Sequence, residues 1–91
     1  MTKVRYYANL RSITGRNEEE IEADGKTVEE ITQMLSSKYG DNFIKLMYSD
    51  GSLRGNVIIL VNGRNTIFYN GIKEILKNND QIDIFPPVAG G

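Results

Sequence analysis

The residues best suited to covalent chemistry are Gly90 and Gly91, because a chain that ends there carries a free α-carboxylate on a residue without a side chain. Two glycines can pass through a channel that is too narrow for any side chain. A carboxylate with a pKa of about 3.5 is ionised at neutral pH and is a poor electrophile. Gly91 would therefore need activation by another molecule before it could form a new covalent bond.

The residues that precede the glycines predict a tail. Pro86 and Pro87 fix the backbone angle φ and lack an N–H donor, so a strand that reaches Phe85 must end there. An extended segment of six residues can span up to roughly 20 Å. We therefore expect a folded domain over residues 1–85 and a C-terminal tail over residues 86–91 that can enter another protein.

The side chains of the tail become smaller toward its end. Val88 and Ala89 are small enough to follow a narrow channel, and Gly90 and Gly91 have no side chain at all. The alternative is that the two glycines are only a frayed chain end, since chain ends are often disordered. The tail interpretation depends on the strand and the two prolines that come before it.

Composition excludes several function classes. The 91 residues carry a net charge of −1 and include no cysteine and no histidine, so the chain has no disulfide, no usual zinc site, no thiol nucleophile and no imidazole base. The near-neutral net charge gives no excess of positive charge that would indicate nucleic-acid binding. The longest apolar run, residues 57–61, is far too short to span a membrane, and Met1-Thr2-Lys3 opens no signal peptide. We expect a cytoplasmic protein with no metal site.

The hydrophobic pattern predicts a mixed α+β fold. The segments with strand patterns are residues 3–8, 18–23, 57–61, 65–68 and 81–85. In the first of these segments, Val4, Tyr6 and Ala8 face the core. In the second segment only Ile21 and Ala23 do, and its acidic outer side suits an edge strand. The alternative for the second segment is a solvated loop. Thr27 and Glu30 form a capping box that begins the main helix.

The remaining segments predict short helices and the sheet order. Gly40 ends the main helix, and residues 10–13, 41–48 and 72–76 have helical spacing. A helix between two hairpin-like halves packs across one face of a mixed sheet of about five strands. The first and last strands are then parallel neighbours in its middle.

The other face of the sheet is predicted to carry an apolar patch at the base of the tail. If Val57, Ile59 and Val61 point to the core, their neighbours on the same strand point outward. The four residues that we expect to form a partner-docking surface are Tyr7, Ile58, Leu60 and Phe85. The alternative is that the second helix or a nearby loop covers them.

Nearly the whole chain resembles the MoaD family, the small subunits of molybdopterin synthase, which are ubiquitin-like sulfur carriers with the β-grasp fold. The matching stretches are residues 4–11 (VRYYANLR), 27–29 (TVE), 61–63 (VNG) and 80–91 (DQIDIFPPVAGG). The end FPPVAGG is the most specific of them. Extra residues at about 42–56 resemble archaeal variants of the family, some of which are similar to protein modifiers that become attached to lysine.

The resemblance implies a mechanism that uses partner proteins. A ubiquitin-activating-type adenylyltransferase would use ATP to convert Gly91 to an acyl-adenylate, and a sulfur donor protein would displace AMP and leave a thiocarboxylate. Pro86 and Pro87 would aim the tail, Val88 and Ala89 would fit the channel and Gly90 would permit threading. The tail would then insert into the large subunit of molybdopterin synthase and give sulfur to the pterin precursor of the molybdenum cofactor. The resemblance implies no bound cofactor and no catalysis by this chain alone.

Other functions remain open at this stage. Activated Gly91 could be transferred to lysine, as in a ubiquitin-like modifier, and the activation step would be the same. The chain could instead serve thiamine synthesis, tRNA thiolation or a tungsten pathway, which differ only in the partner. A β-grasp binding module with an incidental tail is the remaining alternative.

Overall fold

The computed structural model describes residues 1–87, apart from the side chain of Phe68. The main sheet contains β1 (Thr2–Tyr6), β2 (Glu18–Ile21), β5 (Ile58–Val61), β6 (Arg64–Asn65) and β7 (Gln81–Phe85). Its strand order is β2-β1-β7-β5-β6. β1 and β7 are parallel in the centre, and the other neighbours are antiparallel. The predicted mixed five-stranded sheet with parallel first and last strands is confirmed.

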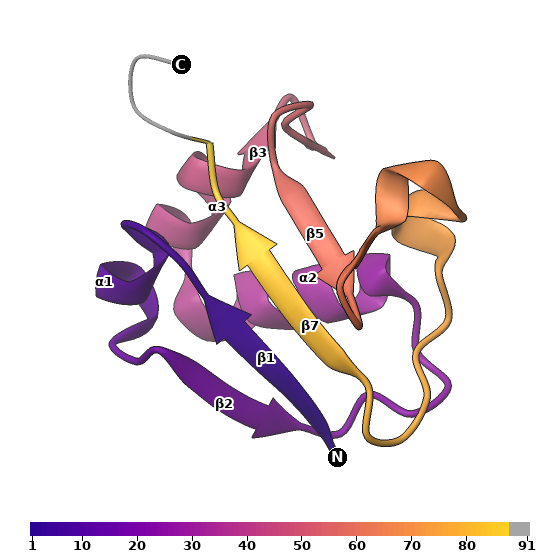
Figure 1. The fold of residues 1–91 in the computed structure, drawn as a ribbon. Helices are drawn as coiled ribbons and strands as arrows, with labels where there is room; N and C mark the ends of the chain where they lie inside the picture. Colours follow the sequence, from indigo (N-terminus) through magenta and orange to yellow (C-terminus); the bar gives the residue numbers. More distant parts are fainter. Residues whose placement is uncertain (88–91) are drawn as a thin grey trace.

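Helices cover one face of this sheet (Figure 1). They are α1 (Leu10–Thr14), α2 (Val28–Tyr39) and α3 (Asp41–Met47), followed by a separate hairpin of β3 (Tyr48–Ser49) and β4 (Ser52–Leu53). The predicted capping box begins α2. The Thr27 side-chain oxygen accepts a hydrogen bond from the Glu30 backbone N–H at 3.1 Å, and the Glu30 carboxylate accepts one from the Thr27 backbone N–H at 2.9 Å. The main helix and the second helix therefore form where the sequence predicts them. Among residues 1–87, no helix lies over the opposite face of the sheet in Figure 1.

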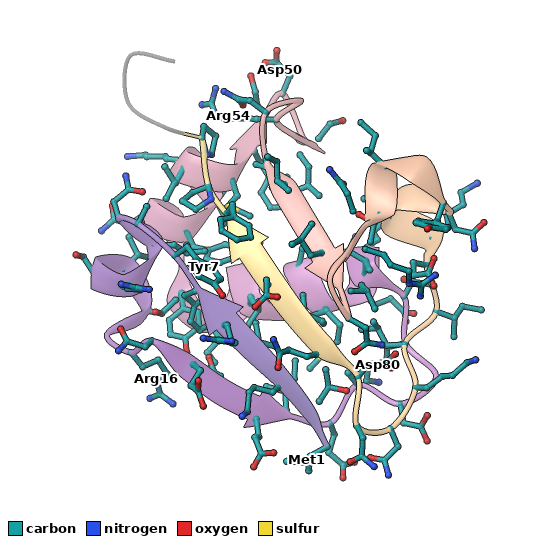
Figure 2. All side chains as sticks on the ribbon, in the orientation of Figure 1. Met1, Tyr7, Arg16, Asp50, Arg54 and Asp80 are labelled. Carbon is teal, nitrogen blue, oxygen red and sulfur yellow. The ribbon has the colours of Figure 1, made fainter. Side chains whose placement is uncertain are left out.

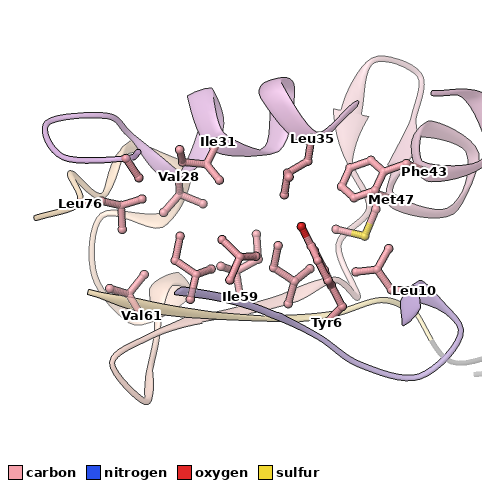
Figure 3. Close-up of a cluster of buried hydrophobic side chains, with 14 residues drawn as sticks. Tyr6, Leu10, Val28, Ile31, Leu35, Phe43, Met47, Ile59, Val61 and Leu76 are labelled. Carbon is pink, nitrogen blue, oxygen red and sulfur yellow. The ribbon is translucent and has the colours of Figure 1, made fainter. Parts of the chain in front are cut away.

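The core lies between the sheet and α2, with α3 closing one end (Figure 3). Inward strand positions alternate with outward ones, as expected for a sheet with one buried face. The buried apolar side chains from the sheet are Val4, Tyr6, Ile59, Val61, Ile82 and Ile84. Val28, Ile31 and Leu35 of α2 pack against them, and Phe43 and Met47 come from α3. No helix among residues 1–87 has the length and hydropathy of a membrane span.

Two local predictions after β5 were wrong. Residues 65–68 do not form a return strand, because β6 stops at Asn65. The Asn65 side chain accepts a hydrogen bond from the Ile67 backbone N–H at 3.1 Å and so begins the 3₁₀ turn η1 (Thr66–Phe68). Residues 72–76 are helical only through η2 (Gly71–Lys73). Beyond it the backbone of Leu76 bonds with Lys26 and Gly25, so this segment ties down the start of α2 instead of continuing as a helix.

Two residues near the first two strands also differ from prediction. Ala8 is exposed and does not extend β1, because its φ of 55° turns the chain toward α1. Glu19 was expected on the solvent face of β2 but its side chain is only 5% exposed. Glu19 pairs in register with Val4, an inward residue, and directly opposed residues lie on the same face of a sheet. The edge position of β2 itself is confirmed.

Glu19 joins β1, β2 and α2 through its carboxylate. It accepts hydrogen bonds from Tyr6 at 2.5 Å, from Lys38 at 2.6 Å and from Tyr39. Burial opposes ionisation, but the donated hydrogen bonds, first that of Lys38, outweigh it and hold the pKa of Glu19 below its usual range. A carboxylate with three donors is stabilising only while it is ionised, so part of the stability of this edge depends on pH.

We expect Glu19→Gln to lower the free energy of unfolding at pH 7 by about 2 kcal/mol, because an amide leaves one of the three donors without an acceptor. The pKa of Glu19 falls on folding. Its contribution is therefore complete above the unfolded value of about 4.3 and disappears as the pH falls through the lower folded value. Urea denaturation of the wild type and of Glu19→Gln from pH 7 to pH 2 measures this difference in the free energy of unfolding.

The matched control is Glu20→Gln, an exposed neighbour on the opposite side of β2. It should change stability by less than about 0.5 kcal/mol. A difference between wild type and Glu19→Gln that stayed constant down to pH 2 would contradict the role assigned to the ionised carboxylate.

Candidate functional site

The end of β7 is the part of the molecule from which the tail leaves. β7 lies between β1 and β5, and its last pair in the ladder is Phe85 opposite Ile58. The two prolines follow at once; Pro86 is buried and Pro87 is half-buried, so the chain is still packed on the domain at Pro86. Val88, Ala89, Gly90 and Gly91, to which the sequence assigns threading and chemistry, lie outside the described residues.

The predicted docking residues lie together on the face opposite α2. Ile58 and Leu60 alternate with the buried residues Ile59 and Val61 of β5, so they point away from the core. Ile58 is 44% exposed. Phe85 follows the buried Ile84 in the same way. Tyr7 lies on the same face of the sheet, the one turned toward the viewer in Figure 2. We call these four residues, Tyr7, Ile58, Leu60 and Phe85, the outer-face patch.

An aromatic stack stands at the base of the tail. The rings of Tyr7 and Phe85 lie 4.1 Å apart between centroids at an interplanar angle of 14°. The guanidinium groups of Arg11 and Arg5 lie 5.5 and 5.9 Å from the centre of the Tyr7 ring, within the range of a cation–π contact. Neither helix α2 nor α3 contributes to this stack. The Tyr7–Phe85 stack therefore forms the aromatic part of the outer-face patch, next to Pro86.

Sequence reasoning missed Asp83, which lies beside the outer-face patch. Asp83 accepts a hydrogen bond from the Tyr7 hydroxyl at 3.0 Å and pairs in register with Arg5 and Leu60. Burial and, after it, this hydrogen bond raise the pKa of Tyr7, so the phenol stays protonated and remains a donor at neutral pH. The alternation Ile82-Asp83-Ile84 marks Asp83 as outward, but only the parallel register of β1 and β7 places it next to Arg5.

The described residues contain no other site next to the tail. A groove of about 670 Å³ lies between α2, α3 and the β3–β4 hairpin, and Ser36, Lys45 and Arg54 are among the residues that line it. No residue of the outer-face patch lines this groove. Among residues 1–87 no group of three or more His, Cys, Asp or Glu side chains is placed to hold a metal ion. The features that adjoin the start of the tail are therefore the outer-face patch and the strand end at Phe85.

Comparison with known families and proteins agrees with this arrangement. The family model described as the ThiS family matches residues 4–91. A candidate sulfur carrier protein from Archaeoglobus fulgidus is 34% identical over 89 residues, which are 98% of this chain and 97% of the relative. Small archaeal modifier protein 3 from Haloferax volcanii is 30% identical, with 98% and 97% covered. The molybdopterin synthase sulfur carrier subunit from Haemophilus influenzae is 29% identical, with both chains covered completely.

Solved structures show the same fold. The solution structure of small archaeal modifier protein 1 from Methanosarcina acetivorans has a TM-score of 0.83 and 34% identity, and covers 99% of this chain and 95% of that one. A chain in the crystal structure of the BexX/CysO complex from Amycolatopsis orientalis is similar too, with a TM-score of 0.77, 29% identity and both chains covered completely. The ubiquitin-like β-grasp fold is therefore confirmed.

The position of Phe85 predicts how two neighbouring substitutions differ. Phe85→Ala removes a half-buried ring and its stack, so we expect a loss of about 1–2 kcal/mol in the free energy of unfolding. Ile84→Ala, at a fully buried position, should cost about 4 kcal/mol because it leaves a cavity. Urea denaturation measures both. Equal losses would show that Phe85 is a core residue and not part of an exposed patch.

Proposed function

This chain belongs to the ThiS family, which includes ubiquitin-like sulfur carriers and protein modifiers, and on that premise we propose that it is a sulfur carrier whose reactive atom is on Gly91. The observation that carries the proposal is the strand end at Phe85, followed by two prolines and by a family match that continues through Gly91. The unit that carries sulfur is the tail, residues 86–91, and the body is residues 1–85.

The chemistry begins with activation of the carboxylate. A carboxylate oxygen of Gly91 attacks the α-phosphorus of ATP, pyrophosphate leaves and an acyl-adenylate forms. A sulfide-level nucleophile delivered by a sulfur donor protein then attacks the acyl carbon. A C–S bond forms, the acyl C–O bond to AMP breaks, AMP leaves and the thiocarboxylate remains on Gly91. The activating protein is an adenylyltransferase of the ubiquitin-activating type, and it must supply the catalytic groups because this chain has no histidine and no cysteine.

The acceptor that we propose is the pterin precursor of the molybdenum cofactor. The tail would enter the large subunit of molybdopterin synthase, with Val88 and Ala89 in the channel and Gly90 at its narrowest point. The outer-face patch would dock on that subunit, since it surrounds the base of the tail. The relative from Haemophilus influenzae, named as the sulfur carrier subunit of this synthase, supports the assignment, as does the FPPVAGG end.

A second function is supported by other relatives. Small archaeal modifier proteins 1 and 3 are 34% and 30% identical to this chain, and the first has a TM-score of 0.83. An acyl-adenylate can be attacked by sulfur or, after further transfer, by a lysine amine, so one tail can serve both purposes. Sulfur carriage for tRNA thiolation or thiamine synthesis would use the same activation and a different acceptor.

We expect Gly91→Ala to abolish ATP-dependent thiocarboxylation and to leave the fold unchanged, because the added methyl group lies where the active-site channel is proposed to admit only backbone. Intact-mass measurement after incubation with ATP and host extract reports the exchange of one oxygen for sulfur. The control is Ala89→Gly, which shortens a side chain within the tail and should retain activation. Thiocarboxylation of Gly91→Ala at the wild-type rate would contradict the proposal.

The same incubation separates the two functions. A carrier gives free protein with the oxygen-to-sulfur mass gain, whereas a modifier gives isopeptide adducts on lysines of other proteins. We expect the first product, and both products together if the chain has both roles. Adducts without any thiocarboxylate would contradict the carrier assignment and favour the modifier.

A further inference from the structure

Asp83 is an unusual residue for its place in the fold. It lies in the central strand β7 on the face that no described helix covers, yet only 8% of the residue is exposed. Its cross-strand neighbours are Arg5 on β1 and Leu60 on β5. A buried carboxylate is costly unless it is paired or hydrogen-bonded, so its contacts indicate what keeps it there.

The contacts of Asp83 use mainly one of its two oxygens. Oδ1 accepts from the Tyr7 hydroxyl at 3.0 Å and from Gln81 Nε2 at 3.4 Å, and Arg5 Nε lies 4.0 Å away from it. Among the described residues, Oδ2 accepts only the long 3.4 Å hydrogen bond from Gln81. An ionised carboxylate can accept about four hydrogen bonds, so Oδ2 retains unused acceptor capacity.

The hydrogen bond to Asp83 also fixes Tyr7. Tyr7 follows the last residue of β1, and the chain turns away at Ala8, so the strand ladder does not hold its side chain. Its ring is held by the stack on Phe85, and its hydroxyl is held by Asp83. Two contacts at opposite ends of one side chain leave a single orientation of the ring, which is therefore formed before any partner arrives.

The length of the tail determines where the activating enzyme must bind. Four residues follow Pro87, and an extended segment of this length spans at most about 14 Å. An enzyme that binds Gly91 in a recessed active site must therefore touch the domain close to the point where the tail leaves it. The Tyr7–Phe85 stack and Asp83 lie at that point, within the area that such an enzyme covers.

We propose that Asp83 is a positioning and specificity-determining residue for the enzyme that adenylates Gly91. Through Oδ1 it holds the Tyr7 ring on Phe85 as a preformed apolar contact, and through Oδ2 it accepts a hydrogen bond from a cationic or amide side chain of that enzyme. Binding would remove water from this carboxylate, so a partner without such a donor would leave Oδ2 with only the long hydrogen bond from Gln81 and would be rejected. The inference rests on the proposed adenylation of Gly91.

The test is the steady-state rate of ATP–pyrophosphate exchange by the host adenylating enzyme, isolated by its ability to activate the wild-type chain. Tyr7→Phe keeps the ring and removes its hydroxyl, and should raise KM for the carrier about fivefold with kcat unchanged. Asp83→Asn removes the charge on Oδ2 and should raise KM about tenfold. The double variant should raise KM about tenfold and not fiftyfold, because both changes act on one contact network.

The charge-matched control is Asp50→Asn, an exposed aspartate in the turn of the β3–β4 hairpin that is not a member of the outer-face patch. Its φ of 53° suits asparagine, so the fold should be unaffected and KM unchanged. NMR of the free variants gives an independent readout: the ring-current shifts of Tyr7 and Phe85 should decrease in Asp83→Asn while the melting temperature changes little.

The outcomes are distinguishable. Unchanged KM for both Tyr7→Phe and Asp83→Asn, or an equal increase for Asp50→Asn, overturns the role of Asp83 and leaves the sulfur-carrier proposal standing. An increase in KM that follows a large loss of melting temperature in both variants also overturns it, since the residue would then be structural. Failure of every host fraction to activate the wild-type chain overturns both proposals.

Discussion

The parallel pairing of β1 with β7 is the constraint on which the candidate site depends. It joins the first and last strands of the domain in the centre of the sheet, with Val4 opposite Ile82 and Tyr6 opposite Ile84 on the core side. Because parallel strands run in the same direction, both end at the same edge of the sheet. Tyr7 therefore lies on Phe85, next to the prolines that end the ladder. Without this pairing the docking residues and the base of the tail would not be neighbours.

The two faces of the sheet differ in what covers them in residues 1–87. On the inner face, α2 and α3 bury the apolar side chains, and the Glu19 carboxylate ties the edge strand β2 to Tyr6 and to α2. On the outer face, the patch lies around the end of β7, with Ile58 exposed and its other three members half-buried. The side chains that form the core and those proposed to meet a partner are thus different, and substitutions in the patch should cost less stability than substitutions in the core.

The proposed chemistry places the reactive carboxylate on this chain and the nucleotide and the sulfur donor on its partners. The chain has no histidine and no cysteine, so it supplies neither an imidazole base nor a thiol to that chemistry. A carrier needs only a reactive terminus and a recognisable body. Relatives named as a sulfur carrier and as small archaeal modifier proteins match nearly the whole of this chain, so the fold alone does not decide which acceptor the tail would meet.

The sequence by itself determined the local structure and the end of the sheet: the capping box at Thr27, the alternation in β1, β5 and β7, and the stop at Pro86 each follow from neighbours along the chain. Only the tertiary structure decided what depends on distant partners. The Glu19 carboxylate finds its three donors on β1 and α2, residues 74–76 bond to the start of α2, and Asp83 meets a tyrosine 76 positions earlier. Alternation predicts on which face a side chain lies, but the partner that it meets there is set by strand register, which a single sequence does not encode locally.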